Sequence, residues 1–252
     1  MLCYTFAFAK GLIMKKAFSM IELLFVIVIV GILSFALAPN FDNTKTLEAA
    51  NQIISHIRYT QQLALNDDQF NPDDANWYKK MWRISFISKG TGDDKNWYYA
   101  VWRDDARDNT GNLNSIKEVA PDPSAPGKYL YNVFSNGKPD TNPNNNPKLD
   151  LTSSFGIKKI EFGGFKGTGT GSQTLVFDEL GRVYSNSSAD KSYDNKHDSV
   201  AAIQLTGDGG DEDSITIMIQ PETGYACIAA DNIIDDKGKI TDNPTCNADY
   251  NL

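Results

Sequence analysis

The feature that most constrains this chain is a long apolar run near its N-terminus. From Phe18 to Ala38 there are 21 residues with a single charge, that of Glu22. A helix of this length would span about 30 Å, which matches the hydrocarbon core of a bilayer. Three lysines and no acidic residue precede the run. The positive-inside tendency therefore predicts a cytoplasmic N-terminus, one membrane-spanning segment and a body on the far side of the membrane.

Two simpler interpretations of this run are weaker. A secretory signal has a shorter apolar stretch and a clean small-residue cleavage site after it, whereas the nearest candidate here is residues 36–38. A plain signal anchor fits the length but leaves Glu22 unexplained. A carboxylate at the centre of an apolar membrane helix costs about 2.5–3.5 kcal/mol on insertion scales, and somewhat less near an end. We therefore expect Glu22 to have a partner.

The start of the run resembles the type IV prepilin signal. Lys15-Lys16-Ala17 is followed by Phe18-Ser19-Met20-Ile21-Glu22-Leu23. The resemblance implies that a prepilin peptidase cuts between Ala17 and Phe18 and that the new Phe18 amine is N-methylated. Glu22 then becomes the fifth residue of the mature chain. The family usually has glycine before the cut, and Ala17 is a small residue that remains compatible with it.

The resemblance also implies how the subunit assembles. In the family, the carboxylate equivalent to Glu22 pairs with the N-terminal amine of a neighbouring subunit. Two opposite charges compensate each other in a low dielectric, where neither is tolerable alone. Gly31 and Pro39 stand where pilin helices have a flexible point and a kink. The implied partners are prepilin peptidase, other pilin or pseudopilin subunits, the inner-membrane assembly platform and membrane lipid.

The segment after Pro39 has the spacing of an amphipathic helix. His56 and Arg58 lie off its apolar stripe, and we expect both to face solvent. The stripe needs a sheet to cover it. Its members follow one another at intervals of three or four residues: Leu47, Ala50, Ile54, Ile57, Gln61 and Ala64.

The remainder of the chain consists of short strand-like runs separated by Gly, Asn, Asp and Pro. The predicted fold class is α+β, with one long N-terminal helix, half transmembrane and half amphipathic, packed on an antiparallel sheet domain. The predicted parts are a leader (1–17, in which Met14 is the expected start and 1–13 an upstream extension), a transmembrane helix (18–38), the periplasmic half of the helix (39–66) and a β-rich head (67–252). The expected strands are Met81–Ser88, Trp97–Arg103, Tyr129–Phe134, Gly156–Phe162, Thr174–Phe177, Val183–Ser185, Val200–Leu205 and Ser214–Gln220.

A second resemblance lies in three segments of the body. Phe177–Val183 (FDELGRV), Pro221–Tyr225 (PETGY) after Ile215–Ile217, and Ile57–Ala64 (IRYTQQLA) are similar to parts of H-type minor pseudopilins and FimT-like minor pilins. The resemblance implies a minor pseudopilin of a type II secretion pseudopilus or its tip. The alternative is a FimT-like minor pilin acting in DNA uptake.

Charge and chemistry narrow these alternatives. The formal charge is −8, from 24 basic and 32 acidic residues, and removal of the leader would make it 21 − 32 = −11. An acidic body repels phosphate backbones, so nucleic acid is not an expected partner.

There are two histidines and no H-E-x-x-H, G-x-S-x-G or phosphate-loop pattern. We therefore predict no enzyme activity, no cofactor and no metal site. Gly207–Asp213 is acidic but lacks EF-hand spacing, which favours a solvated turn over a calcium site.

The three cysteines are either free thiols or include one disulfide. Cys3 lies near the start, while Cys227 and Cys246 lie near the end with 18 residues between them. A periplasmic body favours a Cys227–Cys246 disulfide, because that compartment is oxidising. Closing such a loop contributes about 3 kcal/mol in the chain-entropy model.

Overall fold

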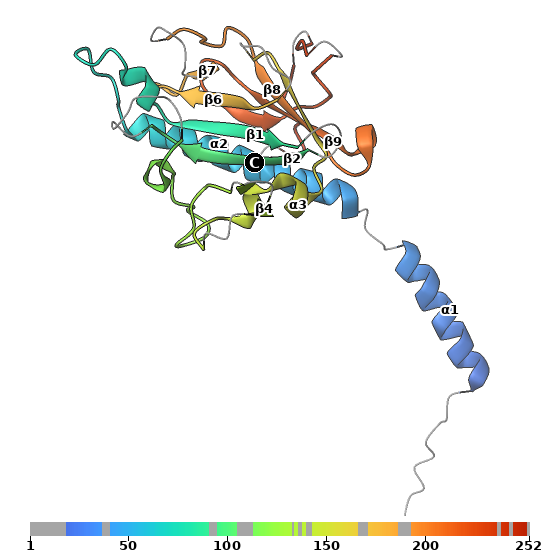
Figure 1. Ribbon diagram of the computed structural model, residues 1–252. Coiled ribbons are helices and arrows are strands. Elements are labelled where there is room, and N and C mark those ends of the chain that lie inside the picture. The colour runs from blue at the N-terminus through green and yellow to red at the C-terminus, as the bar shows by residue number, and fades with distance from the viewer. Residues whose placement is uncertain are drawn as a thin grey trace, which may run out of the picture. The chain divides into compact units, whose positions relative to one another are not determined.

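The structure is a computed structural model in which two compact units, Met1–Asn40 and Phe41–Leu252, are distinguished by their internal contacts (Figure 1). Secondary structure is described for residues 19–36, 41–90, 95–104, 113–132, 134–135, 138–139, 143–165, 171–185, 193–235, 238–241 and 244–250.

The described part of the first unit is one apolar helix, α1 (Met20–Ala36). Its 17 residues contain one charged side chain, Glu22, and are otherwise almost entirely aliphatic or aromatic. Within the described residues, none of the helices combines the length and the apolar character needed to cross a membrane.

The prediction of one long N-terminal helix packed on a sheet is wrong. The helix α1 ends at Ala36, and a separate helix, α2 (Phe41–Asn66), begins the second unit. Residues 37–40, among them Pro39, lie outside the described residues. Proline has no backbone N–H to donate and disfavours helical conformation in the residue before it, so a continuous helix through this point would lose a hydrogen bond. The apolar run and the amphipathic segment after it therefore form two separate helices.

The strands form two four-stranded antiparallel sheets instead of one. The first sheet has the order β2 (Asn96–Trp102), β1 (Arg83–Lys89), β6 (Gln173–Phe177) and β7 (Val183–Ser185). The second has the order β10 (Ala226–Ile228), β9 (Ser214–Ile219), β8 (Ala201–Thr206) and β5 (Lys159–Gly163). The remaining elements are the pair β3 (Phe134–Ser135) and β4 (Lys138–Pro139), the short helix α3 (Leu151–Phe155), and the 3-10 helices η1 (Trp77–Lys80), η2 (Ile116–Glu118), η3 (Pro147–Leu149) and η4 (Gly210–Asp213).

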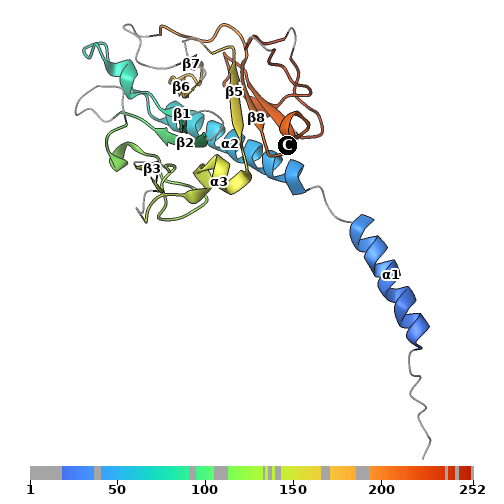
Figure 2. The same ribbon diagram turned by 45° about the vertical axis from the view of Figure 1, so that its right-hand side comes forward.

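The helix α2 contacts strands of both sheets, as Figures 1 and 2 show. Its apolar stripe enters one core cluster together with inward-facing residues of the two sheets and with α3. Burial of this stripe supplies the stabilisation that a helix of ordinary propensity lacks in isolation. Fully buried members of the cluster include Ile53, Ile57, Ile84, Phe86, Leu175, Phe177, Ile203, Leu205, Ile217 and Ile219.

The outer face of the second sheet is also covered. On β9, Ile217 and Ile219 join the main core, whereas Met218 joins a second cluster that contains Cys227 and Ile233. The partners in that cluster come from Ala202 of β8, from β10 and from the segment after β10. Because both faces of β9 are covered, its sequence is apolar at successive positions instead of alternating.

One strand prediction is largely wrong, and two of the described strands, β4 and β10, were not predicted. Of Tyr129–Phe134, only Phe134 lies in a described strand, β3. The backbone of Leu130 instead bonds Val101 and Ala120, which belong to strand β2 and the segment after η2. The sequence predicted neither β4 nor β10, although the equally short β7 was among the expected strands.

Candidate functional site

The first turn of α1 follows directly after the predicted cleavage point. Ser19 precedes the helix, and its Oγ accepts a hydrogen bond of 3.2 Å from the backbone N–H of Glu22. A serine before the first turn and an acidic residue within it are both favoured, because they satisfy or attract the free N–H groups there. Ala17 and Phe18 themselves lie outside the described residues.

The large apolar side chains of α1 are exposed around the whole helix. Their exposed fractions run from 46% at Val26 to 91% at Met20. Glu22 is exposed as well. Gly31 lies inside α1, and a Cβ atom added there would have no neighbouring atom within 4 Å outside the helix's own backbone. Pro39, the other predicted kink residue, lies outside the described residues. An apolar surface of this extent is stable only where another apolar medium or partner covers it.

The three body segments with the second resemblance meet at one point, which we call the α2 junction. Gln61 of α2 donates hydrogen bonds from Nε2 to the carbonyl oxygens of Gly181, at 3.1 Å, and of Thr223. Gly181 and Gly224 both have positive φ, at 78° and 61°. A Cβ at either position would also collide with the Gln61 side chain. Both glycines are therefore required by backbone conformation and by the close approach of α2.

Asp178 organises the turn on the sheet side of the α2 junction. This fully buried carboxylate accepts bonds from the backbone N–H groups of Leu180 (3.0 Å) and Arg182 (2.8 Å) and from Arg182 Nε (2.6 Å) and the Tyr184 hydroxyl (2.9 Å). Burial and the Asp178 carboxylate raise the pKa of Tyr184 above its ordinary value. Partial burial opposes the charged form of Arg182, but its hydrogen bond to Asp178 raises the pKa. The glycine-arginine turn thus has a structural explanation in its own contacts.

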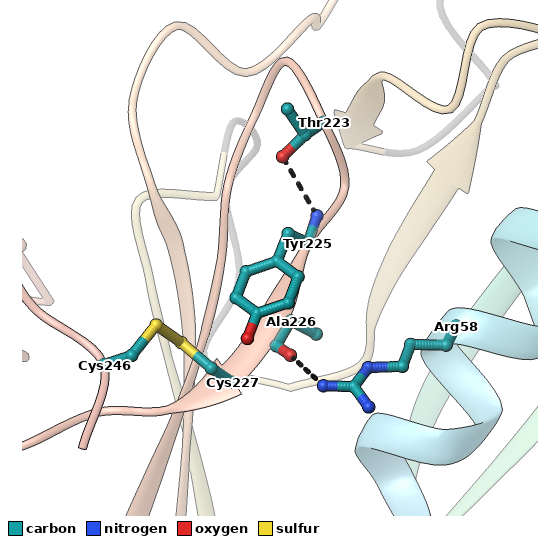
Figure 3. The surroundings of a disulfide bond; sticks show 6 residues. All are labelled: Arg58, Thr223, Tyr225, Ala226, Cys227 and Cys246. Atoms are coloured by element: carbon teal, nitrogen blue, oxygen red, sulfur yellow. Dashed lines mark hydrogen bonds between the residues drawn. A yellow bond between two sulfur atoms is a disulfide. The ribbon is translucent and has the colours of Figure 1, made fainter. Parts of the chain in front are cut away.

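The helix side of the α2 junction reaches the predicted disulfide. Arg58 donates to the carbonyl oxygen of Ala226 at 3.1 Å, and its guanidinium carbon lies 5.7 Å from the centre of the Tyr225 ring (Figure 3). The next residue, Cys227, forms a disulfide with Cys246, with an S–S distance of 2.07 Å (Figure 3). Arg58 is exposed as expected, yet it is held in place by β10. Cys3 lies outside the described residues.

The expectation that His56 faces solvent is wrong. His56 is buried, and its Nδ1 lies 2.7 Å from the Tyr99 hydroxyl, which also accepts a 2.8 Å bond from Gln52 Nε2. Burial lowers the pKa of His56, and the Asp122 carboxylate opposes this shift. Burial likewise raises the pKa of Tyr99. Because α2 contacts both sheets, it buries a wider arc than the single stripe read from the sequence.

The other described residues that we considered for catalysis or metal binding are buried or are not grouped for such a role. His197 Nε2 lies 2.6 Å from Ser185 Oγ, but the two residues are 1% and 0% exposed, so a substrate cannot reach this pair in the fold described. Within the described residues, no group of three or more His, Cys, Asp or Glu side chains is arranged to hold a metal ion. Asp213, expected in a solvated turn, is buried in η4.

Comparison with known proteins gives no relative: no protein-family model, no curated protein and no solved structure matches the chain.

Proposed function

We propose that this chain is a pilin-like membrane subunit, a minor pseudopilin of a type II secretion pseudopilus or its tip. The observation that carries the proposal is the order Lys15-Lys16-Ala17, Phe18, Glu22 and then the apolar run. Prepilin peptidase would cut before Phe18 and methylate its amine. The mature chain would begin one residue before Ser19, whose Oγ accepts the Glu22 N–H at the start of α1.

The two units support different parts of this role. Residues 18–38 would insert into the inner membrane, where lipid covers the apolar side chains that α1 exposes. The unit Phe41–Leu252 would lie in the periplasm, where its Cys227–Cys246 disulfide persists. Its α2 junction fixes the helix to both sheets, so the unit would act as one body at the filament surface.

Glu22 has the assembly role in this proposal. Within a membrane, its carboxylate would be costly until the Phe18 amine of a neighbouring subunit compensates it. The inner-membrane platform would then extract and add subunits by means of this pairing and of helix packing.

The assembly role is tested with Glu22→Ala and Glu22→Gln in cells that carry the secretion platform. We expect membrane attachment to be retained and the amount in sheared filaments to fall by more than tenfold, because removal of one partner of a buried charge pair costs about 3–5 kcal/mol. Glu48→Ala, an exposed acidic position on α2, is the matched control and should assemble normally. Normal assembly of both Glu22 variants would falsify the proposed role.

The alternative of DNA uptake is less well supported. Its one arginine after Gly181, Arg182, is bonded to Asp178, and Arg58 is bonded to the Ala226 carbonyl. DNA binding needs cations free to neutralise phosphates, and the chain is acidic overall. A gel shift at low salt distinguishes the alternatives, since a DNA receptor retards the fragment and releases it as salt rises, whereas a pseudopilin does not retard it.

A further inference from the structure

The buried histidine of α2, His56, ends a chain of hydrogen bonds that joins three elements. Gln52, one turn earlier on α2, donates from Nε2 to the carbonyl oxygen of Lys148 in η3 (2.9 Å) and to the hydroxyl of Tyr99 in β2 (2.8 Å). The same hydroxyl lies 2.7 Å from His56 Nδ1. The chain of bonds therefore ties α2 to β2 and to η3, which are distant from it in the sequence.

The direction of every bond in this chain is fixed by its first member. A carbonyl oxygen only accepts, so the Lys148 carbonyl requires the amide nitrogen of Gln52 on its side. That nitrogen also donates to Tyr99, whose hydroxyl has one hydrogen to give in turn. This hydrogen goes to His56 Nδ1. His56 is therefore a neutral imidazole that carries its own hydrogen on Nε2.

A protonated His56 does not fit this chain. Its Nδ1 would carry a hydrogen that points at the hydrogen of the Tyr99 hydroxyl, although the two heavy atoms are 2.7 Å apart. Turning the hydroxyl toward Gln52 moves the conflict there, because Gln52 presents an N–H to it. One bond of the chain has to break when the proton is taken up. Burial acts in the same direction, since it lowers the pKa of His56, and the Asp122 carboxylate opposes this shift.

The carboxylate that attracts a protonated His56 is itself connected to η3. Asp122 accepts 2.7 Å bonds from the backbone N–H and the hydroxyl of Ser124, and a further bond from Asn146 Nδ2. Asn146 Oδ1 in turn accepts a 3.0 Å bond from the backbone N–H of Lys148. The backbone of Lys148 is thus held at its carbonyl from the helix α2 and at its N–H from the Asp122 side.

The other titratable groups around His56 keep their charge where a histidine titrates, as far as the tyrosines are concerned. Tyr99 lies on β2 and Tyr59 on α2, and burial raises the pKa of both hydroxyls. Lys148 takes part through its backbone, and its side chain is exposed. Within the chain of bonds from η3 to α2, the charge therefore changes at His56.

We propose that the bonds from Gln52 through Tyr99 to His56 form a pH-sensitive clamp, which opens when His56 takes up a proton. The closed clamp holds η3 and the adjoining α3 against α2. In the open clamp the imidazolium turns toward Asp122, and Gln52 loses the hydroxyl that orients its bond to η3. The second sheet contains none of these groups and keeps its structure. This proposal does not depend on the role in secretion.

The test is hydrogen exchange of the full chain in detergent at pH 7.5 and pH 5.5, corrected for the intrinsic pH dependence of exchange. We expect the protection of residues 143–151 to fall about tenfold, because pH 5.5 lies one unit below the ordinary histidine pKa of 6.5. At pH 5.5 these residues should also be less protected than β9, because the clamp opens without unfolding the second sheet.

Three variants separate the clamp from a general loss of stability. His56→Asn offers an amide oxygen to the Tyr99 hydroxyl but does not titrate, so residues 143–151 should keep their protection at pH 5.5. Tyr99→Phe removes the central hydroxyl and should lower this protection already at pH 7.5. Tyr225→Phe is the matched control, since it removes a hydroxyl from a ring that is 43% exposed, and it should behave as the unchanged chain does.

A second measurement reads the tautomer without relying on a variant's stability. Nitrogen-15 NMR of a histidine-labelled chain distinguishes ring nitrogens with and without hydrogen, and the chain has two histidines to assign. We expect His56 Nδ1 to carry no hydrogen at pH 7.5. The proposal is overturned if Nδ1 carries one at that pH, or if residues 143–151 are as protected as β9 at pH 5.5. It is equally overturned if His56→Asn loses as much protection as the unchanged chain, or if Tyr99→Phe loses none at pH 7.5.

Discussion

The helices α1 and α2 follow each other in sequence but are stabilised in opposite ways. The large apolar side chains of α1 are exposed on all sides, whereas Ala49, Ile53 and Ile57 of α2 have no exposed surface. The helix α2 is held by two sheets, and α1 receives no such cover within its own described unit. The difference teaches that one helix belongs to the folded core and that the other needs an external apolar medium or partner.

The largest expected effect separates two isoleucine truncations. Ile53→Ala on α2 should lower the free energy of unfolding of the second unit by about 2–5 kcal/mol, because it opens a cavity in a closed core. Ile27→Ala on α1, where the side chain is 61% exposed, should leave that free energy unchanged within about 0.5 kcal/mol. Urea unfolding of the full chain in detergent, followed by tryptophan fluorescence, measures both. Equal destabilisation would remove the distinction between the helices.

Removal of the disulfide should also act on the second unit alone. Replacing Cys227 and Cys246 together by serine should cost roughly 3 kcal/mol of stability in the chain-entropy model. Cys3→Ser is the matched cysteine control and should cost nothing measurable. The same urea titration reports stability, and flotation with vesicles reports membrane attachment, which should not change. Loss of attachment in the double variant would contradict the independence of the two units.

Two glycine variants sharpen the account of how α2 is fixed. Gly224→Ala combines positive φ with a collision against Gln61 and should cost about 1–3 kcal/mol. Gly210→Ala has a similar φ of 69° but meets nothing within 4 Å, so it should cost only the backbone strain of about 1 kcal/mol. The difference between their melting curves measures the close approach of Gly224 to Gln61 and to the Gly181 carbonyl oxygen. If the two variants melt alike, close packing at the α2 junction is not important.

The smallest expected effect is a pH dependence that belongs to α2. Because burial lowers the pKa of His56 in the folded chain, the unfolded chain binds the proton first, near pH 6.5. Stability should therefore fall as the pH drops below 6.5, by at most about 1.4 kcal/mol per pH unit, until His56 is protonated in the folded state as well. His56→Gln should flatten this part of the curve between pH 7.5 and 5.5. An unchanged slope would show that other groups cause it.

The sequence predicted the local elements better than their assembly. Seven of the eight expected strands coincide over most of their length with β1, β2, β5, β6, β7, β8 and β9, because alternation of β-branched and aromatic residues is a local signal. Tyr129–Phe134 has the same composition but shares only Phe134 with a described strand, β3, while Leu130 bonds the backbone of Val101 in β2 and of Ala120. The division into two sheets depends on pairing between segments that are distant in the sequence, and the periodicity of apolar residues does not predict such pairing.

The same limit explains the errors on α2 and its surroundings. The spacing identified the stripe correctly at Ala50 and Ile57, yet His56 and Thr60 are buried too, because a second sheet covers the flank of the helix. Cys227 and Cys246 could be paired in advance since there was one plausible partner for each. The bonds of Gln61 to two distant carbonyls could not be foreseen, although the glycines at 181 and 224 marked their positions.

The most direct test of the central claim is the chemistry of the mature N-terminus. The chain is expressed with and without an active prepilin peptidase, and the N-terminal peptide is identified by mass spectrometry. The account predicts that the peptidase yields a peptide beginning at Phe18 with a methylated amine, and that Phe18 is not an N-terminus without the enzyme. An N-terminus that the peptidase leaves intact, or a cut after the apolar run near Ala38, would contradict the account.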